Sequence, residues 1–189
     1  FQAEDGIRDR SVSRGLGVVY KRQVLMYLRL DEGTSDYVIR ACDLDGIIRQ
    51  SLRKFAGEFI DRRLTLHYEP LHLSVVTDEK WLGFVVEQVL SNALKYTPEG
   101  GSITIDAAAP ATLCIRDTGI GITAEDLPRI FDRGYTGRNG RTYRQASGIG
   151  LYLCRRICRD LGHTITASSA AGEGTVLRLD LSRRTGPLE

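Results

Sequence analysis

Apolar residues recur along this chain with two periods, one typical of helices and one typical of strands. The strongest helical segment covers residues 79–96. Its apolar stripe is formed by Leu82, Val86, Val89 and Ala93. The same spacing predicts further helices over residues 46–60, 124–131 and 150–161. We expect Asp45 to cap the first of these three helices and Gly162 to end the last one.

Shorter segments alternate between apolar and polar residues, which predicts half-buried strands. One strand is expected before Asp45, and the others lie over residues 64–69, 73–77, 102–106, 112–117, 164–168 and 175–181. The last two would form a hairpin around Gly172-Glu173-Gly174. The order β-α-β-β-α-β-β-loop-α-β-β predicts an α/β (α+β) two-layer sandwich, in which helices pack on one face of a mixed sheet.

Both ends of the chain and one internal stretch lack these periods. Residues 1–23 resemble the translated reading of a sequencing-library adapter, so we expect a non-native leader there. We interpret residues 24–40 as the end of a helix followed by a linker, 41–183 as the folded domain and 184–189 as a tail. Residues 134–147 are polar and nearly free of aliphatic side chains, which is typical of a mobile loop.

The overall composition excludes several classes of protein. With 42% hydrophobic and 26% charged residues the chain can bury a core, which excludes the disordered and low-complexity classes. Its net charge of +2 is too balanced for a nucleic-acid-binding protein. No apolar run approaches the roughly 18 residues of a membrane span. The cysteines lack zinc-binding spacing and are expected in the core: Cys42, Cys114, Cys154 and Cys158.

The first candidate for chemistry is Asp117-Thr118-Gly119-Ile120-Gly121, which follows a predicted strand directly. An aspartate at the end of a strand can accept a hydrogen bond from an exocyclic amine. The two glycines would let a flat ring approach the backbone closely. Taken alone, the same sequence also suits an ordinary tight turn.

Two further glycine segments have the same ambiguity. Ser147-Gly148-Ile149-Gly150-Leu151 opens a predicted helix, and the free amides and positive dipole at a helix start suit a polyphosphate. A plain helix start explains that sequence equally well. Gly172-Glu173-Gly174-Thr175 is the weakest signal, because hairpin turns use glycine in any case.

The helix predicted over residues 79–96 carries a polar face beside its apolar stripe. Gln88, Asn92 and Lys95 lie at positions i, i+4 and i+7 of that helix and therefore share this face. The Asn92 amide oxygen could ligate Mg²⁺, and Lys95 could contact a phosphate. The alternative is a solvated helix face without any ligand.

The order of these motifs is more specific than any one of them. Together, in this order, they resemble the ATP-binding domain of bacterial sensor histidine kinases. The segments that carry the resemblance are residues 87–97, 117–121, 130–135, 147–153 and 172–175. This domain has the Bergerat-type fold shared by gyrase, Hsp90 and MutL, and the resemblance extends from residue 43 to about residue 181. Residues 131–141 look most like the kinases that partner peptide-antibiotic ABC exporters. Gly134 departs from the commoner Phe-x-Arg-Phe form of this segment.

The resemblance implies a role for each candidate residue. Asp117 would bind the adenine amine, with Gly119 and Gly121 lining its pocket, while Asn92 would ligate Mg²⁺. Further nucleotide-binding positions are implied at Lys95, Tyr96, Phe131, Arg133, Gly148, Ile149, Gly150, Leu151 and Thr175. Gln88 occupies the position at which gyrase-like relatives have a glutamate that activates water. This difference argues against rapid ATP hydrolysis and leaves only a weak assisting role for Gln88.

The resemblance also implies a function for the intact protein. Mg²⁺·ATP would donate its γ-phosphoryl group to a histidine on a dimerisation domain whose last helix ends in residues 24–30, and a response regulator would be the next carrier. The ATP-binding domain would be cytoplasmic, in a protein anchored in the inner membrane and linked to an ABC transporter. The chain's own histidines lack the neighbours of a phosphoacceptor: His67, His72 and His163.

Other functions remain open at this stage. One is a serine kinase of the anti-sigma type, and another is a gyrase- or MutL-like ATPase. The third is a module that binds nucleotide without transferring phosphate. The Tyr96-Thr97 ending of the long helix and the apolar run before residue 31 favour the sensor kinase over the other two enzymes.

Overall fold

The computed structural model describes residues 37–108, 110–137 and 147–182. The predicted leader, linker and tail and most of the predicted mobile loop lie outside these residues. The elements in chain order are β1 (Arg40–Asp43), α2 (Leu44–Asp61), β2 (Thr65–Tyr68), β3 (Ser74–Thr77), α3 (Glu79–Tyr96), β4 (Ser102–Ala108), β5 (Thr112–Asp117), η1 (Leu127–Arg129), α5 (Gly150–Asp160), β6 (Thr164–Ser169) and β7 (Thr175–Asp180).

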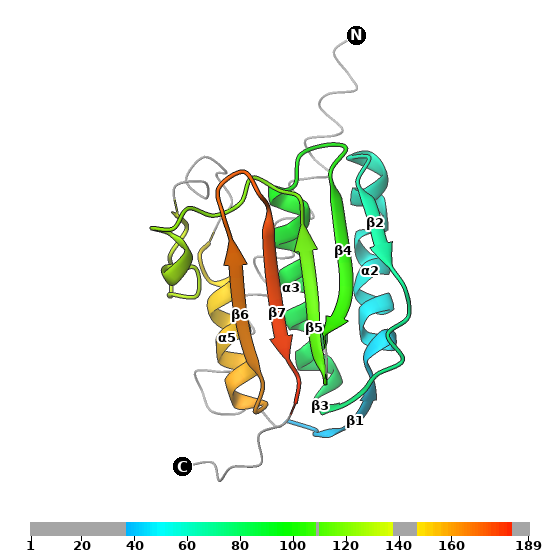
Figure 1. Ribbon diagram of the computed structural model, residues 1–189. Helices are drawn as coiled ribbons and strands as arrows, with labels where there is room; N and C mark the ends of the chain where they lie inside the picture. Colours follow the sequence, from blue (N-terminus) through cyan, green and yellow to red (C-terminus); the bar gives the residue numbers. More distant parts are fainter. Residues whose placement is uncertain (1–36, 109, 138–146, 183–189) are drawn as a thin grey trace, which may run out of the picture.

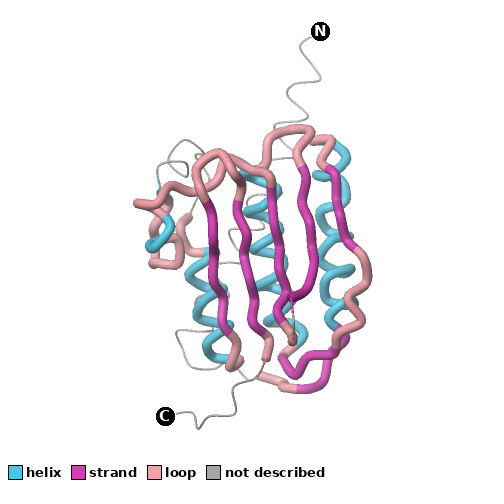
Figure 2. The backbone as a smooth tube through the Cα atoms, in the orientation of Figure 1, coloured by secondary structure: helices cyan, strands magenta, loops and turns pink. Residues whose placement is uncertain are grey.

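The molecule has two layers, a five-stranded sheet and a layer of helices (Figure 1). The strand order is β2-β4-β5-β7-β6; β2 and β4 are parallel, and the other neighbours are antiparallel. Figure 2 shows α2, α3 and α5 together on one face of this mixed sheet. β1 and β3 form a separate antiparallel pair at one end. This architecture confirms the predicted fold class.

The strands present alternate residues to the helices. Ile105, Ile115 and Leu177 are aligned across β4, β5 and β7, and all three are buried. Burying each such side chain contributes roughly 1.5–3 kcal/mol. Arg116 and Arg178 lie on the opposite face, where they bond to side chains of neighbouring strands. The polar face therefore remains open to solvent while the apolar face packs on the helices.

Helix α3 is the central element of the helical layer and packs against both α2 and α5. Its predicted stripe is buried throughout, with Leu82, Val86, Val89 and Ala93 no more than 4% exposed. The Asp78 carboxylate accepts a hydrogen bond from the Trp81 amide at 3.0 Å and caps the start of the helix. Pro98 follows the last residues and disfavours a further turn.

The prediction that Asp45 caps α2 is wrong. Asp43 is the N-cap, and its carboxylate accepts hydrogen bonds from the amides of Asp45 and Gly46 at 3.0 and 3.1 Å. The Asp45 side chain points inward and bonds to the loop between β2 and β3 instead. Both residues are aspartates near a helix start, so only the tertiary contact decides which one is the cap.

The helix predicted over residues 124–131 is also wrong, because only the 3₁₀ turn η1 forms there. Pro128 lies in its first turn and has no amide proton to donate. The neighbouring amides bond over shorter spans, Arg129 to Asp126 at 2.9 Å and Asp132 to Arg129 at 2.9 Å. At the end of α5, Gly162 has a φ of 76° directly after the cap residue Leu161, as expected for a glycine that ends a helix.

All four cysteines are buried and carry free thiols. Cys42, Cys154 and Cys158 belong to the hydrophobic core, as predicted. Cys114 differs, because it pairs with Asp106 and Arg178 in the strand register and so lies on the polar face of the sheet. The side chains around it leave it only 4% exposed, so it is buried as predicted, although it lies outside the main apolar cluster.

Candidate functional site

Three of the predicted ligand-binding segments meet at one end of the molecule. This end contains the last turn of α3, the end of β5 and the start of β7 (Figure 1). The Ile120 amide donates to the Tyr96 carbonyl oxygen at 3.1 Å, which joins the Asp117 turn to α3. The Thr175 amide donates to Asp117 Oδ1 at 3.2 Å, which joins the same turn to β7.

Asp117 is a buried carboxylate with an uneven set of partners. The residue is only 8% exposed. Its Oδ1 accepts hydrogen bonds from the amides of Gly119 (2.8 Å) and Thr175. Within the part of the chain that the structure describes, both hydrogen bonds to this carboxylate go to Oδ1. Burial raises the pKa of Asp117, and the two amide bonds only partly oppose this rise. Oδ2 can therefore accept a bond from an amine.

The glycines of the Asp117 turn are required by packing against protein. A Cβ on Gly119 would lie 2.6 Å from the Tyr96 carbonyl oxygen, and one on Gly121 would lie 1.9 Å from the Ala170 carbonyl oxygen. Gly121 also has a φ of 67°. These contacts bring the turn against α3 and the β6–β7 hairpin. Contact of the same glycines with a flat ring stays a prediction.

The polar face of α3 differs from a solvated helix face. Gln88 is only 8% exposed, and Asn92 and Lys95 are half-buried. Burial lowers the pKa of Lys95, whose Nζ lies 5.1 Å from the ring centroid of Tyr96. A half-buried amide and ammonium on consecutive turns can interact with a charged ligand more strongly than fully solvated groups could.

Helix α5 runs antiparallel to α3, which brings its first turn towards the Asn92 half of that helix. Near the end of α5, His163 Nε2 lies 3.0 Å from Thr77 Oγ1, just before α3 begins. In the middle, Cys154 Sγ lies 3.9 Å from the Val85 carbonyl oxygen. Ile149, the residue at the start of α5, has no capping side chain, and among the described residues its own amide donates to Ser147 Oγ at 3.3 Å. The first amides of α5 are thus suited to an anion.

Gly148 packs against the turn that contains Gly134. The Gly134 amide donates to the Gly148 carbonyl oxygen at 3.0 Å, and a Cβ on Gly148 would lie 2.4 Å from the Gly134 carbonyl carbon. Gly134 has a φ of 75°, which other residues rarely adopt. The backbone conformation at this position therefore favours glycine over the commoner phenylalanine.

The remaining predicted residues divide into packing and surface positions. Phe131, Ile149 and Leu151 are half-buried and pack against the hydrophobic core. Arg133, in contrast, is exposed. The ring of Phe131 also lies 5.8 Å from the guanidinium carbon of Arg155 in α5. Direct contact of these four residues with a nucleotide stays a prediction.

Comparison with known protein families identifies the group to which this arrangement belongs. The family model described as histidine kinase-, DNA gyrase B-, and HSP90-like ATPase matches residues 77–185, more than half of the chain. The chain belongs to this ATPase family. The match extends from the start of α3 beyond β7 and so contains every predicted site residue.

The curated relatives of this ATPase domain are sensor kinases. The sensor histidine kinase YxdK of Bacillus subtilis (strain 168) is 35% identical over 166 residues, which cover 82% of this chain and 50% of YxdK. The sensor protein BceS of Halalkalibacterium halodurans is 32% identical over 184 residues, which cover 93% of this chain and 55% of BceS. The chain spans about half the length of these curated relatives.

Solved structures share the fold. The mycobacterial sensor histidine kinase MprB matches with a TM-score of 0.61 and 25% identity, over 76% of this chain and 97% of that chain. Full-length ShkA in complex with AMPPNP gives a TM-score of 0.74 over 95% of this chain and 38% of that chain; its 22% identity shows the fold alone. With the family match and the curated relatives, the chain carries the catalytic ATP-binding domain of the sensor histidine kinase type.

Ser169, which was not among the predicted site residues, connects two parts of the ATPase site. Ser169 Oγ accepts a hydrogen bond from the Ile122 amide at 2.8 Å and donates to the Gly174 carbonyl oxygen at 2.6 Å. It thus fixes the Asp117 turn to the β6–β7 hairpin. A serine near a predicted hairpin is too common a feature to signal this role.

The polar face of α3 carries an amide oxygen suited to binding Mg²⁺. Asn92 presents an amide oxygen at a half-buried position, and Mg²⁺ typically takes one or two protein oxygens together with waters and phosphates. Over the described ranges no group of three or more His, Cys, Asp and Glu side chains forms a metal cluster. A single amide ligand completed by nucleotide phosphates fits these residues.

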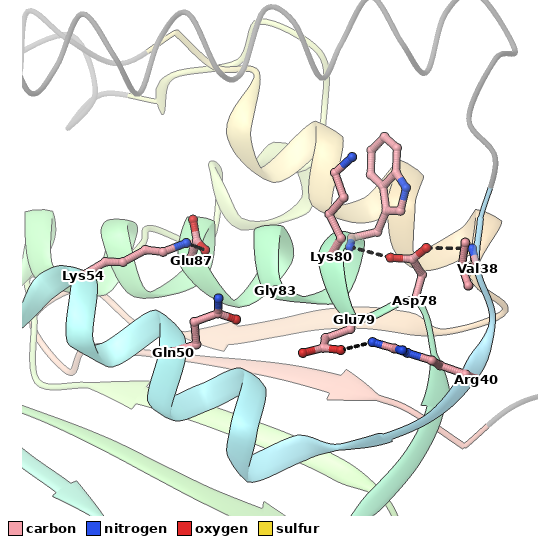
Figure 3. Close-up of a pocket in the computed structure, with 10 residues that line it drawn as sticks. Val38, Arg40, Gln50, Lys54, Asp78, Glu79, Lys80, Gly83 and Glu87 are labelled. Atoms are coloured by element: carbon pink, nitrogen blue, oxygen red, sulfur yellow. Dashed lines mark hydrogen bonds and ion pairs between the residues drawn. The ribbon is translucent and has the colours of Figure 1, made fainter.

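A cavity lies between α2 and the first half of α3 (Figure 3). This cavity of about 520 Å³ is lined in part by Gln50, Lys54 and Glu87, and no predicted site residue lines it. Four of its charged side chains are paired, because Arg40 bonds to Glu79 and Lys54 bonds to Glu87. Lys80 also lines the cavity.

Proposed function

We propose that this domain transfers the γ-phosphoryl group of ATP to a histidine on the dimerisation domain of a two-component sensor histidine kinase. The observation that carries the proposal is that the Asp117 turn is joined to the end of α3 at one end of the molecule, while the antiparallel α5 begins beside the Asn92 half of α3 (Figure 1). Each of these elements offers a different group: a carboxylate oxygen, an amide with an ammonium, and the amides of a helix start.

Each group suits one part of Mg²⁺·ATP. Asp117 Oδ2 would accept a hydrogen bond from the adenine amine, which would fix the base beside this turn. Lys95 and the first amides of α5 would bind the phosphates. Asn92 would hold the Mg²⁺ ion, which supplies charge neutralisation for the phosphates when bound. Phosphoryl transfer depends mainly on such positioning and electrostatics.

The same face of α3 favours transfer over hydrolysis. Gln88 is a neutral amide at the position of the water-activating glutamate in gyrase-like relatives, and an amide cannot take a proton from water at neutral pH. The adjacent acid, Glu87, bonds to Lys54 of α2 and is directed away from that face. Water at this site would therefore find no general base on this face of α3.

The phosphoacceptor would be supplied by another domain. His67 and His72 are exposed on or near β2, an edge strand of the sheet, which β4 separates from β5. His163 is buried beside Thr77, at the opposite end of α3 from Asn92. The chain's own histidines are thus poorly placed to receive the γ-phosphoryl group.

The wider setting follows from the kinase role. ThkA, a neighbour in fold, has been solved in complex with the response regulator TrrA, and we extend this type of partner to the present domain. No helix in the described residues is long and apolar enough to cross a membrane. We propose a cytoplasmic domain of a protein anchored in the inner membrane. The resemblance of residues 131–141 supports a link to an ABC transporter.

The test combines nucleotide binding with phosphate labelling. Calorimetry should detect binding of ATP and ADP, and incubation with labelled Mg²⁺·ATP should leave no acid-labile phosphate on the chain itself. A histidine-bearing dimerisation domain supplied in trans should become labelled. Absence of nucleotide binding would contradict the proposal. Sustained phosphate release would favour a gyrase- or MutL-like ATPase. An acid-stable label on a protein partner would favour a serine kinase. Nucleotide binding without any transfer would favour an interaction module.

A further inference from the structure

The end of α3, which carries the residues proposed to bind ATP, accepts two hydrogen bonds from an arginine of the preceding helix, α2. Arg62 is the residue that ends α2, and its guanidinium donates through one terminal nitrogen to the Leu94 carbonyl oxygen. The other terminal nitrogen donates to the Thr97 carbonyl oxygen at 2.5 Å. One side chain thus contacts two carbonyls at the end of the neighbouring helix.

These carbonyls lie where a helix needs outside partners. The last carbonyl oxygens of an α-helix have no amide to accept from within the helix, and a cation there also interacts favourably with the helix dipole. The planar guanidinium fork matches two acceptors at once, which a lysine ammonium on a flexible stem does less well. The Arg62 carbonyl oxygen additionally accepts from the Gly100 amide at 3.2 Å, which fixes the turn after α3.

The other side of the same helix end is held by the turn that carries Asp117. The Tyr96 carbonyl oxygen accepts from the Ile120 amide, so the end of α3 lies between Arg62 and this turn. A shift of the end of α3 would move Asn92 relative to Asp117. The adenine-binding and phosphate-binding parts of the site would then no longer match one nucleotide.

We infer that Arg62 is a positioning residue for nucleotide binding, which keeps the end of α3 at the correct distance from the Asp117 turn without touching the ligand. This inference rests on the proposed function of the site. It predicts that loss of the guanidinium weakens nucleotide binding more than it loosens the rest of the fold.

The test uses the full chain with matched arginine variants. Arg62→Met keeps the aliphatic stem and removes both donors, and Arg63→Met is the control, because the Arg63 side chain is 81% exposed and pairs only loosely with Glu99 at 3.5 Å. Calorimetry with ADP and with Mg²⁺·AMPPNP should give an affinity about tenfold weaker for Arg62→Met, which is about 1.4 kcal/mol. Arg63→Met should bind as the unmodified chain does.

Amide hydrogen exchange separates positioning from general destabilisation. The Ile120 amide bonds to the end of α3, and the Leu82 amide bonds to Asp78 at its start. In Arg62→Met the Ile120 amide should exchange faster while the Leu82 amide keeps its rate. A purely structural role would accelerate both amides together.

Two results would overturn the inference. One is an affinity for Arg62→Met equal to that of Arg63→Met, and the other is equal acceleration of both amides. If Arg62→Met does not fold, Arg62→Lys is tested instead, because lysine keeps the charge without the guanidinium fork. A nucleotide affinity for Arg62→Lys below that of the unmodified chain, but less than tenfold below it, supports the inference. An unchanged nucleotide affinity overturns it. If the unmodified chain binds no nucleotide, the proposed function fails, and the exchange of the Ile120 amide alone decides the role of Arg62.

Discussion

Two buried aspartates in this molecule have opposite surroundings. Asp45, at the start of α2, is 3% exposed, and both of its oxygens are occupied by the amides of Leu71 and His72, at 2.8 and 2.7 Å, and by the Tyr68 hydroxyl. Asp117, at the end of β5, is 8% exposed, and its described hydrogen bonds reach only one oxygen.

The difference appears in the pKa of each carboxyl group. Burial works to raise the pKa of Asp45, but the hydrogen bonds from Tyr68 and the two amides outweigh it and lower the pKa. Burial raises the pKa of Asp117, because two amide bonds to one oxygen compensate less. A fully bonded carboxylate holds the structure together, whereas a half-bonded one keeps an acceptor for a ligand.

The largest expected effect is on stability and comes from Asp45. Asp45→Ala leaves the Leu71 and His72 amides without their acceptor, and we expect the free energy of unfolding to fall by about 3 kcal/mol. Urea denaturation measures this loss. The control is Asp43→Ala, which removes the exposed cap of α2 together with a surface ion pair to Arg49 at 3.3 Å and should cost about 1 kcal/mol. Equal losses for the two variants would contradict the distinction between the two aspartates.

The next effect is on binding and comes from Asp117. Asp117→Ala removes the proposed acceptor for the adenine amine, and we expect ATP and ADP to bind about 2 kcal/mol more weakly. Calorimetry measures the change, and Asp106→Ala, on the polar face of the sheet, is the matched control. Unchanged nucleotide affinity in Asp117→Ala would contradict the proposed role of this carboxylate.

A smaller effect concerns the metal. Asn92→Ala removes an amide oxygen and should weaken ATP binding by about 1 kcal/mol in the presence of Mg²⁺. The same variant should bind ADP as the unmodified chain does when the metal is chelated. A loss of the same size with and without Mg²⁺ would show that Asn92 contacts the nucleotide or the fold rather than the ion.

The smallest effect is a difference in pH dependence between the two aspartates. The folded pKa of Asp45 lies below the ordinary value of 3.8, so its stabilising contribution is present above that value and is lost as the pH falls through the folded pKa. The folded pKa of Asp117 lies above 3.8, so its contribution is present at low pH and is lost as the pH rises through the folded pKa.

Asparagine variants would measure this contrast. Between pH 3 and pH 6, urea denaturation should show Asp45→Asn becoming less stable relative to the unmodified chain, and Asp117→Asn becoming more stable relative to it. The same trend in both variants would show that the two carboxyl groups do not differ in their protonation as described.

Local signals predicted some elements well and failed for others. Helix α3 has the predicted bounds Glu79–Tyr96, because its apolar stripe lies within the segment and the Asp78 cap and Pro98 lie beside its ends. The cap of α2 was assigned to the wrong aspartate, since the choice depends on the β2–β3 loop. The helix over residues 124–131 was overestimated because Pro128 outweighs the apolar spacing.

The candidate site shows the same division. The ordered motifs predicted which segments share a site, and the structure brings Asp117, Tyr96 and Thr175 together. The sequence did not indicate Arg62 or Ser169, whose side chains bond to backbone atoms of distant segments. Such bonds depend on where two chain segments cross, and any arginine or serine can make them.

The sequence by itself determined the periods of helix and strand, and through them the two-layer sandwich and the order of its motifs, because these depend on residues a few positions apart. Only the tertiary structure decided which carboxylate is fully bonded and which keeps an oxygen for a ligand. Hydrogen bonding and burial of a side chain depend on neighbours from other elements, and Asp45 and Asp117 acquire theirs only when the chain is folded.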